Sequence, residues 1–341
     1  MNLNNDIHYY SEDGTKFSSK ISAVEYSQKT GQEVKFYFYD DVYSKVDWKK
    51  ELPHDLDYYY KQQALRLREK YDYLILTYSG GSDSTCILET FAYNNIKLDK
   101  IVSVGAFSKD SNWGVDENHN GEIYHNVIPY IKELGLESIT DIVDYTEYLR
   151  DDNFKNLSIY KHGENWSHEI GGYFSVHNFF WRDAEKILVP KEWKNKKVGL
   201  IFGTDKPNVV LSEDGLPSLV FTDTCVTYYG NSLGFENVDR IRFFWDQNFT
   251  DIIVKQTQKI KAVGHFLGGE KNIAKIVYDL KKPLNFQSPK TSNFFWSLRD
   301  TYLREMKQTE LFKFYSEGLK LVESKVGFKS MNPIASKKHL I

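Results

Sequence analysis

The sequence predicts an α/β protein whose core is a parallel β-sheet with helices on both faces. Apolar segments with strand character alternate with segments of helical period from about residue 71 to residue 230, a pattern typical of a parallel sheet. A second observation is a turn rich in glycine and serine between a strand and a helix in YLILTYSGGSDSTCILETF, Tyr73 to Phe91. A third is a change of pattern near both ends of the chain, which predicts a small α+β N-terminal element and a helical C-terminal domain.

The N-terminal element is expected to span residues 1–54. Short alternating runs such as VKFYFY, Val34 to Tyr39, lie between polar turns and are typical of strands. From Asp55, a candidate N-cap, the period becomes helical, with an apolar stripe that runs from Leu56 to Leu67. This helix leads directly into the glycine-serine turn region.

The core is expected to span residues 55–235. Its segments follow in this order: strand YLILTY, a helix to Phe91, strand KIVSVGAF, a helix from Glu122 to Glu133, strand ITDIVDY, a helical segment from Val176 to Ile187, and strand VGLIFG. Residues 236–341 contain helical patterns such as FTDIIVKQTQKIKAVGHFL, separated by GGE and by the stretch from Pro283 to Pro289. We therefore expect a helical C-terminal domain.

The composition is that of a globular chain with balanced charge. Its 341 residues allow one large domain or two moderate ones. Because 44 basic residues face 47 acidic ones, with a formal net charge of -3, nucleic acid is not favoured as a partner. The 24 Tyr and 22 Phe are scattered through apolar segments rather than interleaved with Lys and Arg, which favours core packing over base stacking.

Membrane and metal signals are weak. No apolar run approaches the roughly 18 residues of a membrane span, and the first residues lack the features of a signal peptide, so we expect a cytoplasmic protein without a membrane partner. Cys86 and Cys225 form no CxxC, which excludes a four-cysteine zinc site within one chain. His162 and His168 do not have HExxH spacing, and we predict no zinc.

The turn SGGSDS, Ser79 to Ser84, carries the strongest functional signal. A turn from a parallel strand into a helix lies at the carboxyl edge of the sheet, where ligands of open α/β folds bind. The free N–H groups at the start of the helix suit a phosphate group. We expect Gly80 and Gly81 to let the backbone approach the phosphate oxygens, and Ser79, Ser82 and Ser84 to add hydroxyl donors.

Asp83, inside the same turn, points to a metal ion. A carboxylate beside a phosphate repels it unless Mg²⁺ bridges the two groups or the acid caps the helix. The turn does not have the pattern GxxxxGK[ST], so a kinase-like loop with its own lysine is excluded at this position. We expect a magnesium-bound polyphosphate, with Asp83 as catalytic residue and metal ligand. The alternative is a glycine turn capped by Ser and Asp that binds no ligand.

In its setting between strand and helix, SGGSDS resembles the SGGxDS signature of the PP-loop ATP pyrophosphatases. The resemblance implies a HUP-like core of the adenine nucleotide alpha hydrolase type, with ATP and Mg²⁺ as cofactors. It implies cleavage of ATP between the α- and β-phosphates, with pyrophosphate held by this turn and AMP transferred to a substrate oxygen. Two segments, HDLDYYYKQQALRLREKYDYLILTYSGGSDS and FFWDQNFTDIIVKQTQKIKAV, also resemble tailed-bacteriophage proteins described as asparagine-synthase-like, which would place the protein in a host cytoplasm.

A second candidate loop follows the apolar strand VGLIFG and contains Gly203, Thr204, Asp205 and Lys206. In PP-loop enzymes a late strand often ends in a loop that completes the nucleotide site. The resemblance therefore implies that Gly203 and Thr204 bind the nucleotide and that Asp205 and Lys206 are catalytic. Lys206 would neutralise phosphate charge, and Asp205 would hold Mg²⁺. The alternative is an ordinary turn with an ion pair in solvent.

Two further groups are candidates for the nucleotide site. Val104, Gly105 and Phe107, at the end of KIVSVGAF, are candidates for an adenine slot, although core packing explains them nearly as well. His177 and Arg182 are candidates for the same crevice, with Arg182 opposite the α-phosphate. A salt bridge on the surface is the other interpretation of Arg182.

Four residues remain open between a functional and a structural role. Lys255 and Gln256 lie on a C-terminal helix that either covers the site or exposes this face to solvent. Cys225 is either a persulfide-bearing nucleophile or a small buried side chain, and the second is favoured because its neighbours carry no positive charge. Cys86 is expected to pack against the sheet.

The leading hypothesis is an ATP-dependent ligase or amidating enzyme. It would adenylate a carboxylate or carbonyl oxygen of its substrate, release pyrophosphate, and let an amine or ammonia displace AMP. Asn2 stands where an N-terminal glutaminase would need Cys, so a separate protein is the expected donor of ammonia or sulfur. The alternatives are a nucleobase-modifying or thiolating PP-loop enzyme and a regulatory module that binds ATP or AMP without turnover. The sequence indicates a small-molecule or nucleobase substrate without identifying it, and it leaves the oligomeric state open.

Overall fold

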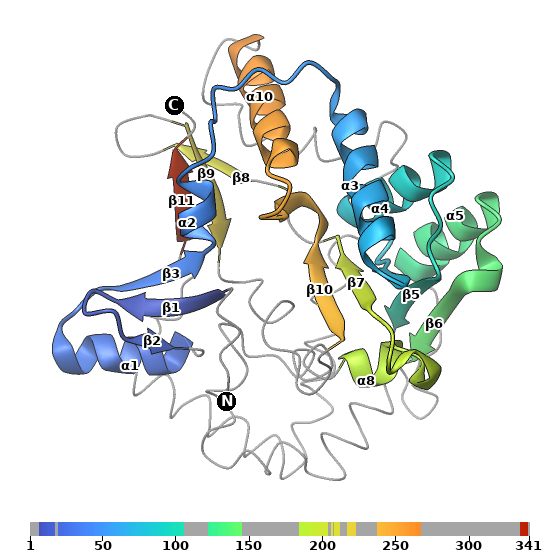
Figure 1. The fold of residues 1–341 in the computed structure, drawn as a ribbon, viewed down its shortest axis with the longest axis horizontal. Helices are drawn as coiled ribbons and strands as arrows, with labels where there is room; N and C mark the ends of the chain where they lie inside the picture. Colours follow the sequence, from blue (N-terminus) through green and yellow to red (C-terminus); the bar gives the residue numbers. More distant parts are fainter. Residues whose placement is uncertain are drawn as a thin grey trace.

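The core of the protein is a five-stranded parallel sheet flanked by helices, with two three-stranded antiparallel sheets beside it, as seen in a computed structural model (Figure 1). The predicted α/β class with a parallel core is confirmed. The structure describes residues 7–17, 20–105, 122–144, 184–203, 206, 208–211, 217–222, 237–266 and 335–339.

The large sheet has the strand order β10-β7-β4-β5-β6. Its strands are β4 (Tyr73–Thr77), β5 (Lys100–Gly105), β6 (Thr140–Asp144), β7 (Val198–Phe202) and β10 (Val238–Arg242). The helices of this unit are α3 (Leu56–Lys70), α4 (Ser82–Tyr93), the π-helix η1 (Ile123–Val127), α5 (Ile128–Glu133), α8 (Ala184–Leu188) and α10 (Asp251–Phe266). Short 3₁₀ turns follow at η2 (Glu137–Ile139), η5 (Lys191–Trp193) and η7 (Phe243–Trp245). The four strands predicted for the core are confirmed.

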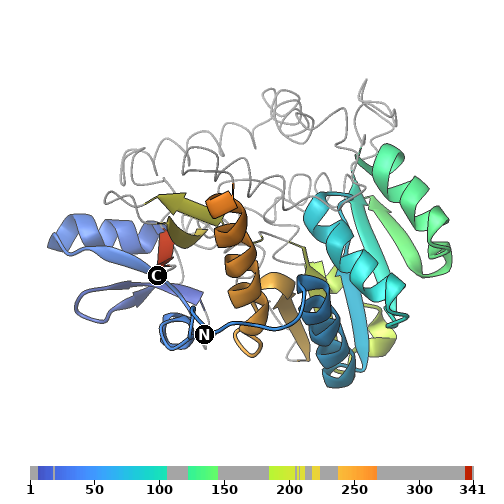
Figure 2. The same ribbon diagram turned by 90° about the horizontal axis from the view of Figure 1, so that it is seen from above.

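Burial explains why β4 and β7 are central. Every residue of β7 is buried, and in β4 only Tyr73 is partly exposed. Such strands need cover on both faces, as parallel sheets have. On one side α3 and α4 pack against β4, and α10 packs on α3. In both views of the ribbon, α10 stands between this helical layer and the N-terminal unit (Figures 1 and 2).

The strand order contains one reversal of direction, between β4 and β7. From β4 the chain adds β5 and β6 on one side of the sheet, and then returns to add β7 and β10 on the other side. Thr77 lies opposite Phe202 in the register of these two strands, so both strands end at the same level. In open α/β sheets, ligands bind outside the carboxyl ends of the strands at such a reversal. The topology therefore marks the loops after Thr77 and Phe202 as the candidate site.

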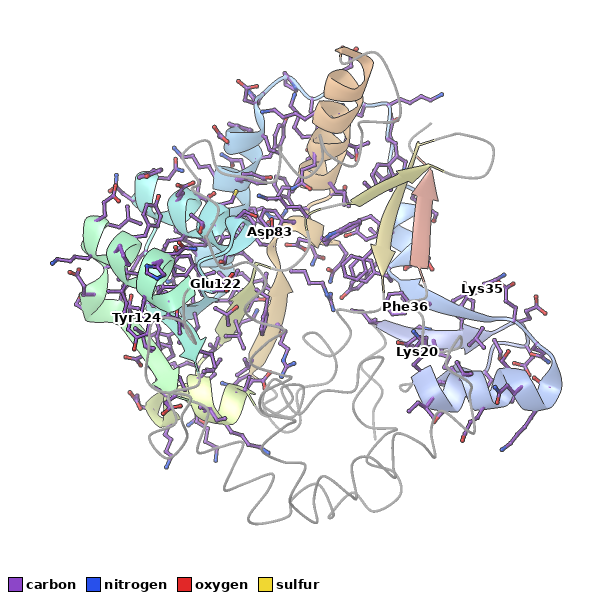
Figure 3. All side chains as sticks on the ribbon, turned by 180° about the vertical axis from the view of Figure 1, so that it is seen from behind. Lys20, Lys35, Phe36, Asp83, Glu122 and Tyr124 are labelled. Carbon is purple, nitrogen blue, oxygen red and sulfur yellow. The ribbon has the colours of Figure 1, made fainter. Side chains whose placement is uncertain are left out.

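The N-terminal unit is a small sheet with a helix on it. Its elements are β1 (Ile7–Ser11), β2 (Lys16–Phe17), α1 (Lys20–Thr30), β3 (Val34–Phe38) and α2 (Asp40–Tyr43). The predicted strand at VKFYFY is therefore confirmed. Lys20 and Lys35 of this unit lie on the opposite side of the molecule from Tyr124 in η1 (Figure 3).

A cluster of aromatic rings joins this unit to the rest of the protein. The rings of Phe38 and Phe221 stack with centroids 3.7 Å apart, and Trp245 meets both rings edge-on. The Tyr43 hydroxyl donates a hydrogen bond to the Trp245 carbonyl over 2.9 Å. Phe221 belongs to β9 (Pro217–Thr222), which pairs with β8 (Asn208–Leu211) and β11 (Ala335–His339). For these rings the predicted role in core packing is confirmed.

Two strands lie in the segment that the sequence predicts as helical. β10 follows the expected core boundary at residue 235, yet it forms the edge of the core sheet beside β7. Its charged residues make the sequence unlike that of a buried strand. The Arg240 side chain is nevertheless buried in an ion pair with Glu185 of α8, and Arg240 Nη2 lies 2.8 Å from Glu185 Oε2. β11 is the other strand, and α10 is a helix as predicted. The division into residues 1–54, 55–235 and 236–341 stays a prediction.

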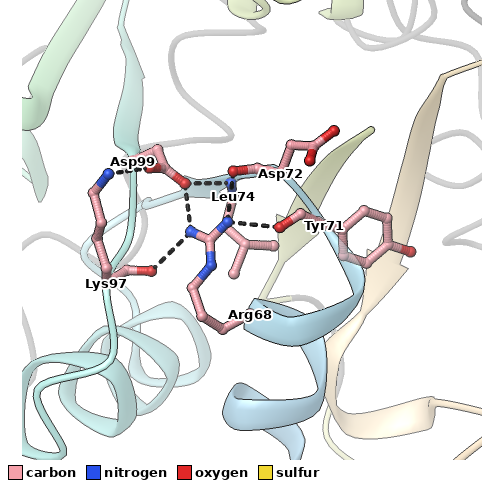
Figure 4. A network of polar contacts seen from close by, with 6 residues as sticks. All are labelled: Arg68, Tyr71, Asp72, Leu74, Lys97 and Asp99. Carbon is pink, nitrogen blue, oxygen red and sulfur yellow. Dashed lines mark hydrogen bonds and ion pairs between the residues drawn. The ribbon is translucent and has the colours of Figure 1, made fainter. Parts of the chain in front are cut away.

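Arg68 joins α3 to the amino ends of β4 and β5 (Figure 4). Its guanidinium lies 2.5 Å from the Asp99 carboxylate through Nη1. Through Nη2 it donates to the carbonyls of Tyr71 and Asp72 over 2.6 and 2.7 Å. These bonds satisfy backbone carbonyls where the helix ends and the strand begins, and so they fix the helix relative to the sheet.

We predict that Asp99→Asn lowers the free energy of unfolding at neutral pH and makes it depend less on pH in the acidic range. Burial alone would raise the pKa of Asp99, but hydrogen bonds from Lys97, Arg68 and the Leu74 N–H hold it below its ordinary value of 3.8. A carboxylate with a lowered pKa stabilises the fold above its unfolded pKa, and this contribution is lost as the pH falls through the lower folded value. We expect a loss of about 1–2 kcal/mol near neutral pH.

Urea unfolding of the wild type and the variant at about pH 7 and about pH 3 measures this effect. The difference between the two proteins should shrink at the lower pH. A difference of the same size at both pH values would show that the charge of Asp99 does not stabilise the fold.

Candidate functional site at the carboxyl ends of β4 and β7

The predicted strand–turn–helix arrangement of SGGSDS is confirmed. The turn leaves β4, and α4 begins at Ser82 with Gly81 as the N-cap residue. The Tyr78 N–H donates to the Val102 carbonyl over 2.8 Å, which extends the pairing with β5 beyond the end of β4. Gly80 has φ +77°, a left-handed conformation that favours glycine. The N–H groups of the first turn of α4 therefore lie at the carboxyl edge of the sheet, where an anion can meet them.

The serine hydroxyls brace the turn from within. The Ser84 hydroxyl donates to the Gly81 carbonyl over 3.1 Å and accepts from the Ser79 N–H over 3.3 Å. The Gly81 N–H donates to the Ser79 hydroxyl over 3.2 Å. Ser84 is 3% exposed, and its single hydroxyl proton is used inside the turn. Ser84 therefore does not donate to phosphate as expected. Ser82 is partly exposed at the start of the helix.

The second loop lies directly against the first. Gly203 follows β7, and a Cβ atom on it would lie 2.6 Å from Ser84 Cα and 2.7 Å from Ser84 N. No other residue type fits at such a distance from rigid backbone atoms. The sequence prediction that both loops contribute to one region is therefore supported by close packing between Gly203 and the first turn of α4.

Lys206 reaches Asp83 from the second loop. The Lys206 Nζ lies 3.4 Å from Asp83 Oδ1, and the two side chains are 10% and 20% exposed. The same ammonium lies 5.1 Å from the centroid of the Phe244 ring, within range of a cation–π interaction. Asp83 lies near the middle of the molecule in Figure 3. This pair is therefore largely buried, unlike the ion pair in solvent of the alternative interpretation.

Two titratable side chains near the pair, Cys86 and Tyr60, have raised pKa values. Burial raises the pKa of Cys86 to about 11, although the nearby Lys206 lowers it in part. Cys86 is thus a neutral thiol at neutral pH, packed against the core as predicted. Burial also raises the pKa of Tyr60 well above 10, and the negative charge of Asp83 adds to this shift. The low polarity around Lys206 and Asp83 strengthens the attraction between them.

Gln256 does not lie on an exposed helix face, and the predicted cover of the site by this helix stays a prediction. Gln256 is 5% exposed and donates from Nε2 to the Tyr60 hydroxyl over 3.0 Å. Lys255 donates from Nζ to the Leu52 carbonyl over 2.8 Å. Gln256 thus attaches α10 to α3, on which α10 packs, and Lys255 attaches it to the segment before α3.

A third element, η1, contacts the turn at Gly80. Asn126 Nδ2 donates to the Gly80 carbonyl over 3.2 Å. A Cβ atom on Gly80 would lie 3.0 Å from Asn126 Cβ and from Val127 Cγ2. Burial raises the pKa of Glu122, the residue before η1. The sequence analysis missed Asn126, since a single asparagine in a helical pattern carries no signal of the carbonyl that it meets.

Other predicted site residues remain predictions. Val104 is partly buried and Gly105 is buried at the end of β5, next to the turn along the sheet. The following predicted residues lie outside the described part of the chain: Phe107, His162, His168, His177, Arg182, Thr204, Asp205 and Cys225. Within the described ranges, no three His, Cys, Asp or Glu side chains gather as a metal-binding group. No helix in those ranges is long and apolar enough to cross a membrane.

Comparisons with known proteins give one kind of match. No protein-family model matches the chain, and no curated protein matches it. Twelve solved chains match it. One of them is the NH3-dependent NAD synthetase from Campylobacter jejuni subsp. jejuni NCTC 11168, in complex with the nitrate ion. It is 13% identical, the match covers 80% of this chain and 96% of that one, and the TM-score is 0.33. The resemblance to bacteriophage proteins stays a prediction.

We predict that Gly203→Ala destabilises the protein by about 1–3 kcal/mol, because the added methyl group overlaps the backbone of Ser84. Gly81→Ala is the matched control within the same site. Gly81 has φ −79°, and its added Cβ would meet only the Ser79 hydroxyl, at 3.3 Å. Urea unfolding should therefore show a smaller loss for Gly81→Ala, and equal losses would contradict the close approach at Gly203.

Proposed function

We propose that the protein is an ATP pyrophosphatase of the PP-loop type that activates a substrate carboxylate or carbonyl oxygen with AMP. An amine or ammonia then displaces AMP, so that the net reaction is an ATP-dependent ligation or amidation. One observation carries the proposal. The SGGSDS turn opens α4 at the strand-order reversal, and Lys206 from the neighbouring loop lies 3.4 Å from Asp83 within it.

The Asp83–Lys206 pair suits a magnesium-complexed polyphosphate. A buried ion pair is costly unless both charges have partners. Phosphate oxygens can replace the carboxylate beside Lys206, and a divalent cation can replace the ammonium beside Asp83. Asp83 supplies carboxylate oxygens, the ligand type that Mg²⁺ prefers. Without ligand, Asp83 and Lys206 balance each other. With ligand, phosphate oxygens would balance Lys206 and the cation would balance Asp83, so that neither charge is left unpaired.

The residues of the site can stabilise the leaving group of the first step. The substrate oxygen forms a bond to the α-phosphorus of ATP, the bond to the bridging oxygen breaks, and its electron pair leaves with pyrophosphate. The positive end of α4 and the Lys206 ammonium stabilise the charge that develops there. Mg²⁺ held by Asp83 would supply further neutralisation of the pyrophosphate charge. In the second step the amine nitrogen bonds to the activated carbon, AMP leaves, and the nitrogen loses a proton.

Cys86 is not a candidate nucleophile for sulfur transfer at this site. A thiolating enzyme needs a thiolate or persulfide near the reacting atoms. Burial raises the pKa of Cys86 to about 11, so that this residue does not supply a thiolate at neutral pH. Cys225, the predicted nucleophile of a thiolating enzyme, lies outside the described residues, so thiolation stays the alternative function.

We predict that Asp83→Asn abolishes ATP–pyrophosphate exchange, with a fall of at least about 100-fold, because the amide no longer pairs with Lys206 or ligates Mg²⁺. The assay uses labelled pyrophosphate, ATP and Mg²⁺ with fractionated metabolite pools as acceptors. Asp141→Asn is the matched control, since Asp141 also pairs with a lysine, Lys100, over 2.9 Å but lies on β6. The control should exchange at the wild-type rate.

Two results would count against the proposal. A folded wild-type protein that binds neither ATP with Mg²⁺ nor pyrophosphate would contradict a phosphate site at this turn. Tight binding of ATP without exchange in any pool would favour the regulatory module instead. Mass spectrometry of adenylated products from an active pool would identify the acceptor.

A further inference from the structure

The Gly80–Gly81 peptide is held from outside the turn, by Asn126 in η1. We propose that Asn126 is a positioning residue, which holds this peptide in the shape that binds pyrophosphate before the ligand arrives. The inference rests on the proposed function of the turn and adds a residue that the SGGSDS pattern does not contain. It concerns the affinity of the site, since Asn126 is assigned no contact with the ligand.

The two polar groups of this peptide are both occupied. Its carbonyl, on Gly80, accepts a hydrogen bond from Asn126 Nδ2 over 3.2 Å. Its N–H, on Gly81, donates to the Ser79 hydroxyl over 3.2 Å. Because the peptide unit is planar, fixing both groups fixes the direction in which the chain enters α4. One of the two bonds is local to the turn, and the other comes from η1.

Gly80 needs such an external hold. At φ +77° it adopts a conformation that glycine exchanges readily with others, because it has no Cβ. Without Asn126, the Gly80 carbonyl would lose its side-chain donor and the turn would have more conformations available. Ordering them on binding would then reduce the affinity for the ligand, as for any site that is not preorganised.

The element that carries Asn126 to the turn, η1, is a π-helix. The Ile128 N–H donates to the Ile123 carbonyl, which gives the wide turn of a π-helix. The Cβ of Asn126 and the Cγ2 of Val127, which are consecutive in sequence, both lie 3.0 Å from the position of a Cβ on Gly80. Single π-turns of this kind occur frequently at functional sites. Val127 supplies packing at this contact, and Asn126 supplies the hydrogen bond.

The two contributions can be separated by substitution. Asn126→Leu keeps the approximate size of the side chain and removes the donor to Gly80. Asn94→Leu is the matched control, since Asn94 Nδ2 donates to the Thr90 carbonyl over 2.9 Å at the far end of α4. Val127→Ala removes packing against the turn and keeps the donor.

The experiment measures binding of inorganic pyrophosphate with Mg²⁺ to the full chain by calorimetry, beside urea unfolding of each variant. We expect Asn126→Leu to weaken pyrophosphate binding roughly tenfold. Asn94→Leu and Val127→Ala should lose stability and bind pyrophosphate within about twofold of the wild type. Asn126→Ala replaces Asn126→Leu if the leucine variant does not fold.

The outcomes distinguish this inference from the proposed function. If the wild type binds no pyrophosphate, the proposed function fails and the inference fails with it. If the wild type binds and Asn126→Leu binds equally well, the inference alone is overturned. If Val127→Ala weakens binding as much as Asn126→Leu does, the contact of η1 with the turn is packing only, and Asn126 is not a positioning residue.

Discussion

The contact between Gly203 and the first turn of α4 is the constraint on which the candidate site depends. β4 and β7 are adjacent and end at the same level, and the backbone after β7 passes so close to Ser84 that a Cβ atom would overlap it. This approach brings the two loops at the strand-order reversal together. It allows Lys206 to reach the carboxylate of Asp83 at the start of α4, the helix that follows β4. A larger residue at position 203 would push the loops apart and separate the charges.

The charges that this contact brings together determine which ligand the site suits. A helix N-terminus favours anions, yet here the first turn of α4 carries a carboxylate, Asp83, which Lys206 balances. The Phe244 ring centroid lies 5.1 Å from the ammonium, and both charged side chains are largely buried. A ligand that brings both anionic oxygens and a cation satisfies the helix terminus, the lysine and the carboxylate together. A simple anion would leave Asp83 without its balancing charge.

The rest of the fold supports the site from a distance. At the opposite end of the sheet, Arg68 and Asp99 fix α3 to the start of β4, and the buried pair of Glu185 with Arg240 fixes α8 to the edge strand. The aromatic cluster around Phe38 and Trp245 connects the N-terminal unit to the segment after β10. These contacts use charges and rings outside the candidate site.

The sequence by itself determined the features that depend on neighbouring residues. Alternating apolar periods predicted the α/β core, and SGGSDS predicted a strand, a tight turn and a helix, because glycine and small polar residues act on the local backbone. Only the tertiary structure decided which distant residues meet that turn. Asn126 bonds to Gly80 across 46 positions, and Lys206 meets Asp83. The charged segment VDRIR pairs with β7 as a strand, and Glu185 neutralises its Arg240. Such pairings depend on strand order and close packing, and no local pattern encodes them.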